Sequence, residues 1–260
     1  MDDIIDYFQL ETHLNVPRQV QKITKKTLLE SPNLTALQKR YIKKEIESLT
    51  IEAILNPTTI NIPAFSNDQY HYQEIAIIRI VFFADQKRIH EHELSEALAA
   101  LIQNPTIFII EKGNQSMIRI NVKRRHKSII SQSVFAYSTR TEWGGLLQQH
   151  PIYQGLDISI YSFKDLYTFH TQLASYIQQS ILRDILGEIV WTPSISYERF
   201  KELMQPYQNT QGEINRLTQE LKGTTEIGQR ASLKQAIIDQ ETILEIQKER
   251  MREELSGNRN

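Results

Sequence analysis

Cysteine is missing from the 260-residue chain. Disulfide bonds, thiolate metal sites, iron–sulfur clusters and a cysteine nucleophile are therefore excluded. An excess of charge of either sign is missing too, because 30 basic and 31 acidic residues leave a formal net charge of −1. The chain as a whole therefore does not attract polyanions, and any contact with nucleic acid has to be local.

Long hydrophobic runs are absent as well. No stretch approaches the roughly 18 apolar residues that a helix needs to cross a bilayer. The sequence starts with the acidic segment Met1-Asp2-Asp3, and the apolar core of a secretion signal does not follow it. We therefore expect a cytoplasmic protein that makes no contact with a membrane.

Glycine is scarce, and the motifs of common enzymes are not found. The nine glycines are not grouped with the spacing of a phosphate-binding loop, and the Gly-x-Ser-x-Gly and His-Glu-x-x-His signatures of hydrolases are absent. The densest group of metal-binding residue types is His90-Glu91-His92-Glu93, where neighbours two apart do not share a helix face. We therefore expect no metal, no cofactor and no catalytic residues.

The middle of the chain alternates between strand and helix patterns. Residues 75–83 are a nearly continuous run of Ile, Val and Phe, which is typical of a strand buried on both faces. Further patterns predict a helix over 92–103 and strands over 106–110, 117–123 and 133–140. This order predicts an α/β (α+β) fold in which helices pack on a mixed β-sheet.

Helical periodicity dominates the first fifty residues. Apolar side chains between Leu34 and Leu49 recur at helical spacing. The outer side of this expected helix is basic and carries Lys39, Arg40, Lys43 and Lys44. Two short strands, over 50–55 and 58–62, are expected next, separated by a turn at Asn56-Pro57, and a long helix is expected over 163–186.

The last part of the chain has the pattern of two long helices. From Glu213 onward the composition changes to Gln, Glu, Lys and Arg with isolated aliphatic residues at helical spacing, interrupted near Gly223 and Gly228. This predicts an antiparallel helical hairpin or coiled coil with a narrow apolar seam that another surface must cover. The predicted partner-binding residues are Ile214, Leu217, Leu221, Leu233, Ile237, Leu244 and Met251.

The sequence thus predicts three parts. They are N-terminal helices over 1–50, a mixed α/β core domain over 51–192 and the C-terminal helical hairpin over 193–260. The seam of the hairpin has two further explanations, which stay open at this point. It could pack within the chain, or it could join two copies of the chain in a structural homodimer.

One segment carries a local excess of positive charge. No acidic residue occurs between Gly113 and Thr141. Side chains on the polar face of the strand 117–123 and in the following loop could bind phosphates, because Arg and Lys complement anionic oxygens. The predicted nucleic-acid-binding residues are Arg119, Lys123, Arg124, Arg125 and Lys127. The alternative is a solvated sheet edge that its charge protects from aggregation.

A divergent metal-dependent nuclease is the enzymatic alternative. A mixed sheet with a helix is a frame on which such enzymes place an acidic residue and a lysine. Glu111 and Lys123 are the residues that come nearest to this arrangement, but no carboxylate on the strand 118–123 could hold Mg²⁺. The sequence therefore favours a protein without catalytic activity.

Several short segments form an ordered set that resembles a known family. They are Asn56–Ile62, Ile75–Phe83, Thr106–Glu111, the strand that ends at Lys123, and Thr141-Glu142-Trp143. Through them, residues 17–185 resemble the bacterial and archaeal family called domain of unknown function 4391. Genes of this family tend to lie beside genes for helicases and DNA methyltransferases, so the resemblance implies antiphage defence and provides no catalytic residues.

The leading hypothesis joins these observations. It is a non-enzymatic accessory subunit that binds a helicase or DNA methyltransferase through its C-terminal helices and contacts DNA through its basic strand.

Overall fold

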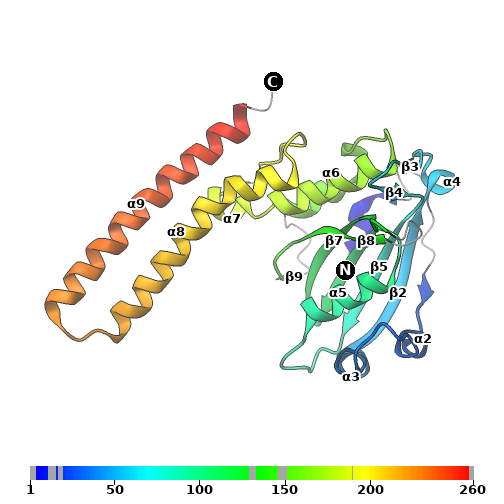
Figure 1. Ribbon diagram of the computed structural model, residues 1–260, viewed down its shortest axis with the longest axis horizontal. Helices are drawn as coiled ribbons and strands as arrows, with labels where there is room; N and C mark the ends of the chain where they lie inside the picture. The colour runs from blue at the N-terminus through cyan, green and yellow to red at the C-terminus, as the bar shows by residue number, and fades with distance from the viewer. Residues whose placement is uncertain are drawn as a thin grey trace. The chain divides into compact units, whose positions relative to one another are not determined.

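A seven-stranded mixed β-sheet lies in the first of two compact units, which cover residues 1–178 and 179–260 (Figure 1). The strand order is β1-β2-β5-β6-β7-β8, and β9 also pairs with β7. Strands β5 and β6 are parallel, and the other described pairs are antiparallel. The strands are β1 (Gln21–Lys22), β2 (Ile46–Leu55), β5 (Ile75–Phe82), β6 (Thr106–Lys112), β7 (Gln115–Arg125), β8 (Ser133–Arg140) and β9 (Gly144–Gly145). The predicted α/β class with a mixed sheet is confirmed.

The computed structural model describes residues 4–10, 16, 20–128, 133–145, 151–188 and 190–257. A small second sheet consists of β3 (Phe65–Ser66) and β4 (His71–Tyr72). The α-helices are α2 (Lys25–Leu29), α3 (Ala36–Glu45), α4 (Pro57–Ile60), α5 (Glu91–Leu101), α6 (Leu166–Gln179), α7 (Leu182–Leu186), α8 (Tyr197–Gly223) and α9 (Ile227–Gly257). Short 3-10 helices cover Ile4–Phe8, Pro151–Leu156 and Ile158–Ile160. Among these described helices, none has the length and apolar composition to cross a membrane.

Helices cover both faces of the large sheet. On the face defined by Ile78, Phe108 and Met117, which we call the α5 face, these residues form one core with Leu94 and Leu98 of α5. Side chains alternate between faces along a strand, so residues such as Thr139 point to the opposite face. There the hydroxyl of Thr139 donates to the carbonyl oxygen of Ala174 in α6 at 3.1 Å. Because both faces are covered, the apolar run that forms β5 lies in the interior as predicted.

The strand predicted over 58–62 is wrong, because residues 57–60 form the short helix α4. The side-chain oxygen of Asn56 accepts hydrogen bonds from the backbone N–H groups of Thr58 and Thr59, at 3.0 and 2.9 Å. Pro57 occupies the first turn, where its missing N–H costs nothing. The Asn-Pro pair therefore starts a helix here, and it does not form a turn between two strands.

The helix predicted from Leu34 onward ends at Glu45, and β2 begins at the next residue. Ile46 and Leu49 are both buried, as their helical spacing suggests, but they belong to a strand. The register of β2 against β5 shifts between Ile46 and Ser48 and again between Ile51 and Ala53. Such bulges break the period of two along a strand, so the apolar residues of β2 are spaced like those of a helix.

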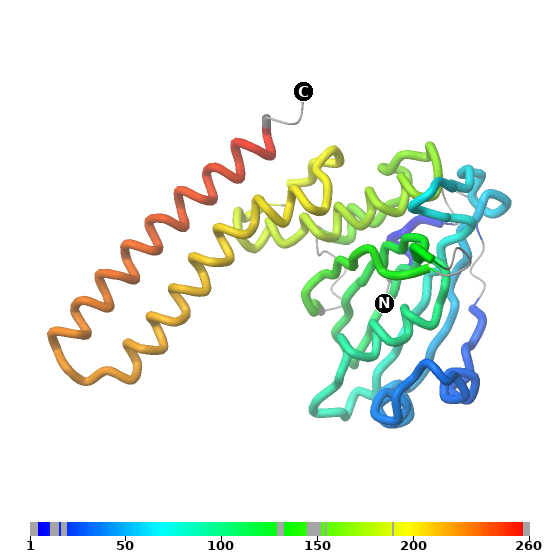
Figure 2. The backbone as a smooth tube through the Cα atoms, viewed as in Figure 1, coloured from blue at the N-terminus to red at the C-terminus, as the bar shows by residue number. Residues whose placement is uncertain are grey.

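The second unit is the predicted pair of antiparallel helices, α8 and α9 (Figure 2). Helix α8 begins at Tyr197, capped by Ser196, and it continues through Pro206. The long helix predicted over 163–186 is divided into α6 and α7, and Gly187 ends α7 with a φ of 84°. At the open end of the hairpin, Phe200 of α8 and Met251 of α9 form an apolar cluster with Leu182 of α7.

Candidate nucleic-acid interface

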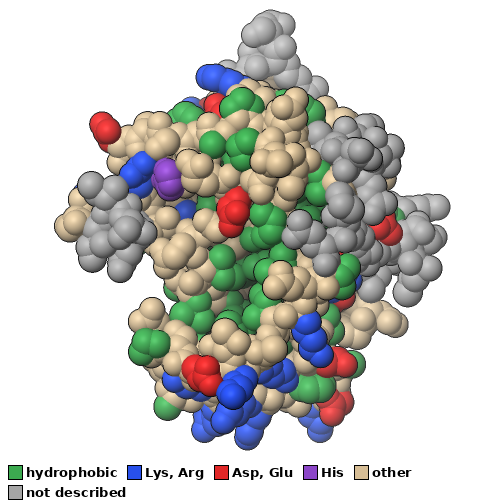
Figure 3. Space-filling model, turned by 90° about the vertical axis from the view of Figure 1, so that its right-hand side faces the viewer, with side chains coloured by type: hydrophobic (Ala, Val, Ile, Leu, Met, Phe, Trp, Pro, Cys, Tyr) green, Lys and Arg blue, Asp and Glu red, His purple; other side chains and the backbone are tan. Residues whose placement is uncertain are grey.

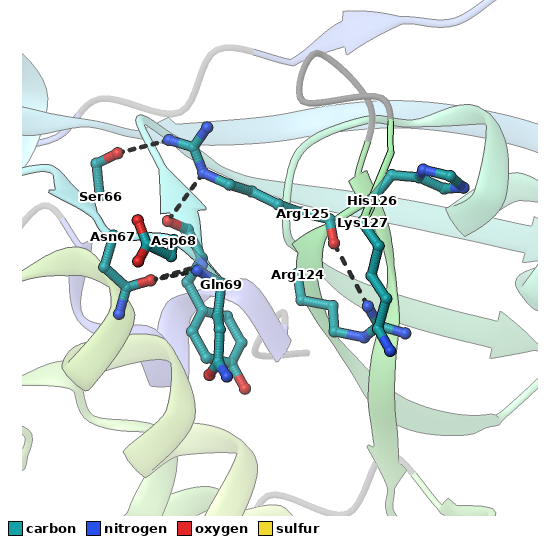
Figure 4. A pocket seen from close by; sticks show the side chains of 9 residues that line it. Ser66, Asn67, Asp68, Gln69, Arg124, Arg125, His126 and Lys127 are labelled. Atoms are coloured by element: carbon teal, nitrogen blue, oxygen red, sulfur yellow. Dashed lines mark hydrogen bonds between the residues drawn. The ribbon is translucent and has the colours of Figure 1, made fainter.

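An open cleft of about 840 Å³ lies at one end of the first unit (Figure 4). Two segments that are distant in sequence line it. One is the loop between β3 and β4, from Ser66 to Tyr70, and the other runs from Arg124 at the end of β7 to Lys127. The backbone N–H of Arg125 donates to the carbonyl oxygen of Gln69 at 2.7 Å, so the two segments are joined directly.

The β3–β4 loop is held by its own asparagine. The side-chain oxygen of Asn67 accepts hydrogen bonds from the backbone N–H groups of Gln69 and Tyr70, at 2.9 and 2.7 Å. The backbone N–H of Asn67 donates to the carbonyl oxygen of Tyr70 at 2.9 Å. Asparagine commonly closes turns by bonding to the backbone in this way, so this wall of the cleft has a defined shape.

The same loop and its flanking strands pack against an aromatic ring of α6. The ring of Tyr167 in α6 lies 5.0 Å from Phe65, 4.4 Å from Tyr70 and 5.3 Å from Tyr72, measured between centroids. The buried hydroxyl of Tyr72 lies 3.4 Å from Nδ1 of His170. Burial lowers the pKa of His170 to about 3, so this histidine is neutral at physiological pH. The loop is therefore anchored to α6.

The side chain of Arg125 links the two segments that line the cleft. Its Nη2 donates to the hydroxyl of Ser66 at 2.7 Å, and its Nε donates to the carbonyl oxygen of Tyr70 at 3.5 Å (Figure 4). These bonds occupy the guanidinium group on the side that faces the loop. We therefore assign Arg125 mainly to positioning the loop.

Arg124 and Lys127 are the cations most available to a ligand in the cleft. Arg124 is half-buried, and the one hydrogen bond of its side chain to a described residue runs from Nη1 to the carbonyl oxygen of Arg125 at 3.4 Å. Lys127 is exposed and forms no hydrogen bond or ion pair with described residues. Among the described residues that line the cleft, Asp68 is the single acidic one. The cleft is therefore positively charged and suits an anionic ligand.

A family model described as Domain of unknown function (DUF4391) matches residues 14–243. The chain belongs to this family. The match extends beyond residues 17–185, where the sequence motifs lie, and reaches into α9. Searches of curated proteins and of solved structures found no match.

Arg119 of this DUF4391 chain is not part of the cleft. The sequence suggests a polar, open face of β7, but α5 covers that face and leaves Arg119 only 1% exposed. Its guanidinium donates to Oδ1 of Asn121 at 3.1 Å and to the hydroxyls of Ser95 and Ser138 at 3.1 and 3.0 Å. Burial lowers the pKa of Arg119, and the nearby carboxylates of Glu91 and Glu96 offset only part of this decrease. Arg119 therefore ties α5 to the sheet.

Lys123 is buried on the same face and is 2% exposed. Its ammonium group donates to the carbonyl oxygens of Ala99 and Ile102 at the end of α5. Those carbonyls belong to the last turn of the helix, where no backbone N–H is available to them. Lys123 thus closes the end of α5, and it does not point to the surface where Arg124 and Lys127 lie.

The two residues of the nuclease alternative lie far apart in the DUF4391 fold. Glu111 pairs with Ser116 near the β6–β7 turn, whereas Lys123 pairs with β8 at the other end of β7. The carboxylate of Glu111 accepts from Nη1 of Arg79 at 2.8 Å on the opposite face of the sheet. Among the described residues, no three His, Asp or Glu side chains lie close enough together to hold a metal ion.

The aliphatic residues predicted to bind a partner lie mainly inside the hairpin. Those that are buried are Ile214, Leu217, Leu233, Leu244 and Met251, and Leu221 and Ile237 are half-buried. A hydrogen bond of 3.0 Å from Nε2 of Gln247 to the hydroxyl of Thr210 crosses the same seam. The two helices therefore cover each other, which corresponds to the intramolecular alternative.

The β3–β4 loop is the part of the cleft that the sequence did not reveal. Its residues Ser66-Asn67-Asp68 are typical turn formers, and that was the local signal available. The pairing of this loop with the end of β7 joins positions more than fifty residues apart, so no local pattern could show it.

Proposed function

We propose that this DUF4391 protein is a non-enzymatic accessory subunit that binds the phosphate backbone of nucleic acid in the cleft. The observation that carries the proposal is the placement of Arg124 and Lys127 on one side of a cleft whose described lining residues include a single carboxylate, that of Asp68. An arginine can bind two phosphate oxygens at once, and a lysine adds a point charge. Both residues are among the nucleic-acid-binding residues that the sequence suggests.

The same geometry argues for binding without base recognition. The residues with free cationic groups are on the β7 side, and each would neutralise one phosphate and release its counterion. Contacts of this kind give affinity that depends strongly on salt and little on sequence. We therefore expect the cleft to bind nucleic acid of many sequences.

The biological setting of the proposal comes from the family. The gene neighbourhood of DUF4391 members supports an antiphage defence system, with a helicase or DNA methyltransferase as the partner. Since the seam of the hairpin is filled from within, a partner would use the outer side of α9. This side carries the exposed residues Ile238, Ile243 and Ile246.

Replacing Arg124 and Lys127 with glutamine is expected to weaken nucleic-acid binding and to make it less dependent on salt. Loss of two phosphate contacts should reduce the slope of log affinity against log salt by about 2. Between 50 and 200 mM salt, the affinity of the unaltered protein should therefore fall about 12-fold more than that of the variant. Fluorescence anisotropy with a labelled 24-base-pair duplex measures both curves.

The matched control removes positive charge from the other unit. Lys222→Gln combined with Lys234→Gln changes the net charge equally at exposed positions of α8 and α9. This control should retain the slope of the unaltered protein. If the cleft variant retains that slope as well, the cleft does not bind phosphates and the proposal is wrong.

A further inference from the structure

A second basic surface, which we call the α2–α3 surface, lies on α2, α3 and Lys22 of β1, outside the cleft. Residues 20–44 contain seven basic side chains and one acidic residue, Glu30. The exposed basic residues are Lys22, Lys26, Arg40, Lys43 and Lys44, and Lys25 and Lys39 are half-buried. In the space-filling view, Lys and Arg side chains gather at the lower end of the face shown, over these two helices (Figure 3).

Most of this charge is not neutralised within the protein. The one ion pair between described residues of this surface is Lys26 with Glu30, at 4.0 Å and largely in solvent. Lys43 and Lys44 lie in the last turn of α3, where the helix dipole favours cations. Lys26 likewise lies in the last turn of α2, but the helix dipoles do not account for Lys22 or Arg40, which lie outside these turns. The concentration of charge therefore calls for an anionic partner.

Helix α3 presents its cations on a firm support. Its first turn is closed by Thr35 and Gln38, whose side chains each accept from the other's backbone N–H, at 3.2 and 2.9 Å. Ile42 on its inner face is fully buried. Glu45 at its end accepts from the backbone N–H of His90 at 2.7 Å. The side chains of Arg40, Lys43 and Lys44 are thus held on one rigid element.

The register of the sheet places this surface at the opposite end from the cleft. Ile46, which follows α3, pairs with Phe82, whereas Leu55 pairs with Ile75, which follows the β3–β4 sheet. A strand rises by about 3.3 Å per residue, so the two surfaces are on the order of 25–30 Å apart. One turn of duplex DNA is about 34 Å long. A duplex longer than one turn is therefore long enough to reach both surfaces.

The apolar residues of α3 argue against a membrane as the partner. A helix that lies in a membrane interface inserts an apolar face between the lipids. The large apolar residues of α3 pack against the core, and Leu37 is the exception at 41% exposed. The surface therefore offers charge with almost no side chain to insert.

We propose that the α2–α3 surface is a second contact for the phosphate backbone of duplex nucleic acid. It engages the same duplex as the cleft, about one helical turn away. In this respect the inference rests on the proposed function of the cleft.

The test combines charge-neutralising variants in the full-length protein. One variant carries Arg40→Gln, Lys43→Gln and Lys44→Gln, a second carries the two cleft substitutions, and a third carries all five. With the 24-base-pair duplex, the α3 variant should reduce the salt slope by about 3 and the combined variant by about 5. Between 50 and 200 mM salt, the loss of three contacts corresponds to a difference of about 40-fold. Thermal melting of each variant establishes that it is folded.

The outcomes separate this inference from the proposed function. An unchanged slope in the α3 variant together with a reduced slope in the cleft variant overturns the inference and leaves the cleft proposal standing. If the slope is reduced in the α3 variant but unchanged in the cleft variant, the cleft proposal is wrong. The inference that both surfaces bind the same duplex is then wrong as well. If the α3 substitutions instead abolish binding to phosphatidylserine vesicles and leave duplex binding intact, the partner is a membrane and the inference is wrong.

Discussion

Replacing Arg119 with methionine is expected to lower the free energy of unfolding by about 3–5 kcal/mol. Methionine retains much of the side-chain volume but donates no hydrogen bond. Oδ1 of Asn121 beneath α5, the hydroxyl of Ser95 in α5 and the hydroxyl of Ser138 in β8 would each lose Arg119 as a donor. A buried polar group without a partner costs far more than a hydrogen bond contributes in net terms. Urea denaturation followed by circular dichroism measures the loss.

Arg124→Met provides the matched control for this experiment. Arg124 belongs to the same strand, and its guanidinium group makes a single long hydrogen bond of 3.4 Å to the carbonyl oxygen of Arg125. We expect it to lose less than about 1 kcal/mol, as is usual away from buried networks. Equal losses in the two variants would mean that Arg119 does not hold α5 to the sheet.

Replacing Lys123 with alanine is expected to cost about 3 kcal/mol at neutral pH. The substitution leaves a cavity where the buried aliphatic stem lay, and it deprives the carbonyl oxygens of Ala99 and Ile102 of their donor. Lys123→Met fills the cavity and removes only the ammonium group, so it should be the more stable of the two variants. Denaturation curves for both variants separate the packing contribution from the polar one.

Lys123 should also make stability depend on pH. Burial lowers its pKa to about 8 in the folded protein, whereas a lysine in an unfolded chain has a pKa of about 10.4. Between these values the unfolded chain binds more protons than the folded protein, so stability rises with pH by up to about 1.4 kcal/mol per pH unit. Lys123→Met should lack this rise. If the difference in free energy of unfolding between the unaltered protein and Lys123→Met stays constant from pH 8 to pH 10, the burial of a charged amine is contradicted.

The sequence predicted β7 and the alternation of its side chains correctly, but it could not show that both faces are covered. Polar residues at alternate positions normally point to solvent. Arg119 and Lys123 are exceptions, because Ser95 and the last carbonyls of α5 satisfy their donors. Those acceptors lie on a different element, more than twenty residues earlier in the chain. The mistake over these two residues therefore arose from tertiary contacts, which a local pattern does not contain.

The hairpin is a second case in which the local pattern was predicted and the tertiary contacts were not. The spacing of Ile214, Leu217, Leu233 and Leu244 predicted two helices and their shared seam. It did not reveal that each helix would fill the seam of the other. Arg124 and Lys127 were predicted from charge alone, whereas the β3–β4 loop that lies opposite them was found only in the folded structure.

Hydrogen–deuterium exchange on the full chain tests binding in the cleft most directly, because it locates the bound ligand without altering a residue. With a saturating 24-base-pair duplex, amide exchange should slow in residues 66–70 and 124–128, and it should remain unchanged in the hairpin formed by α8 and α9. Saturated binding that leaves both cleft segments unprotected would contradict the proposed interface.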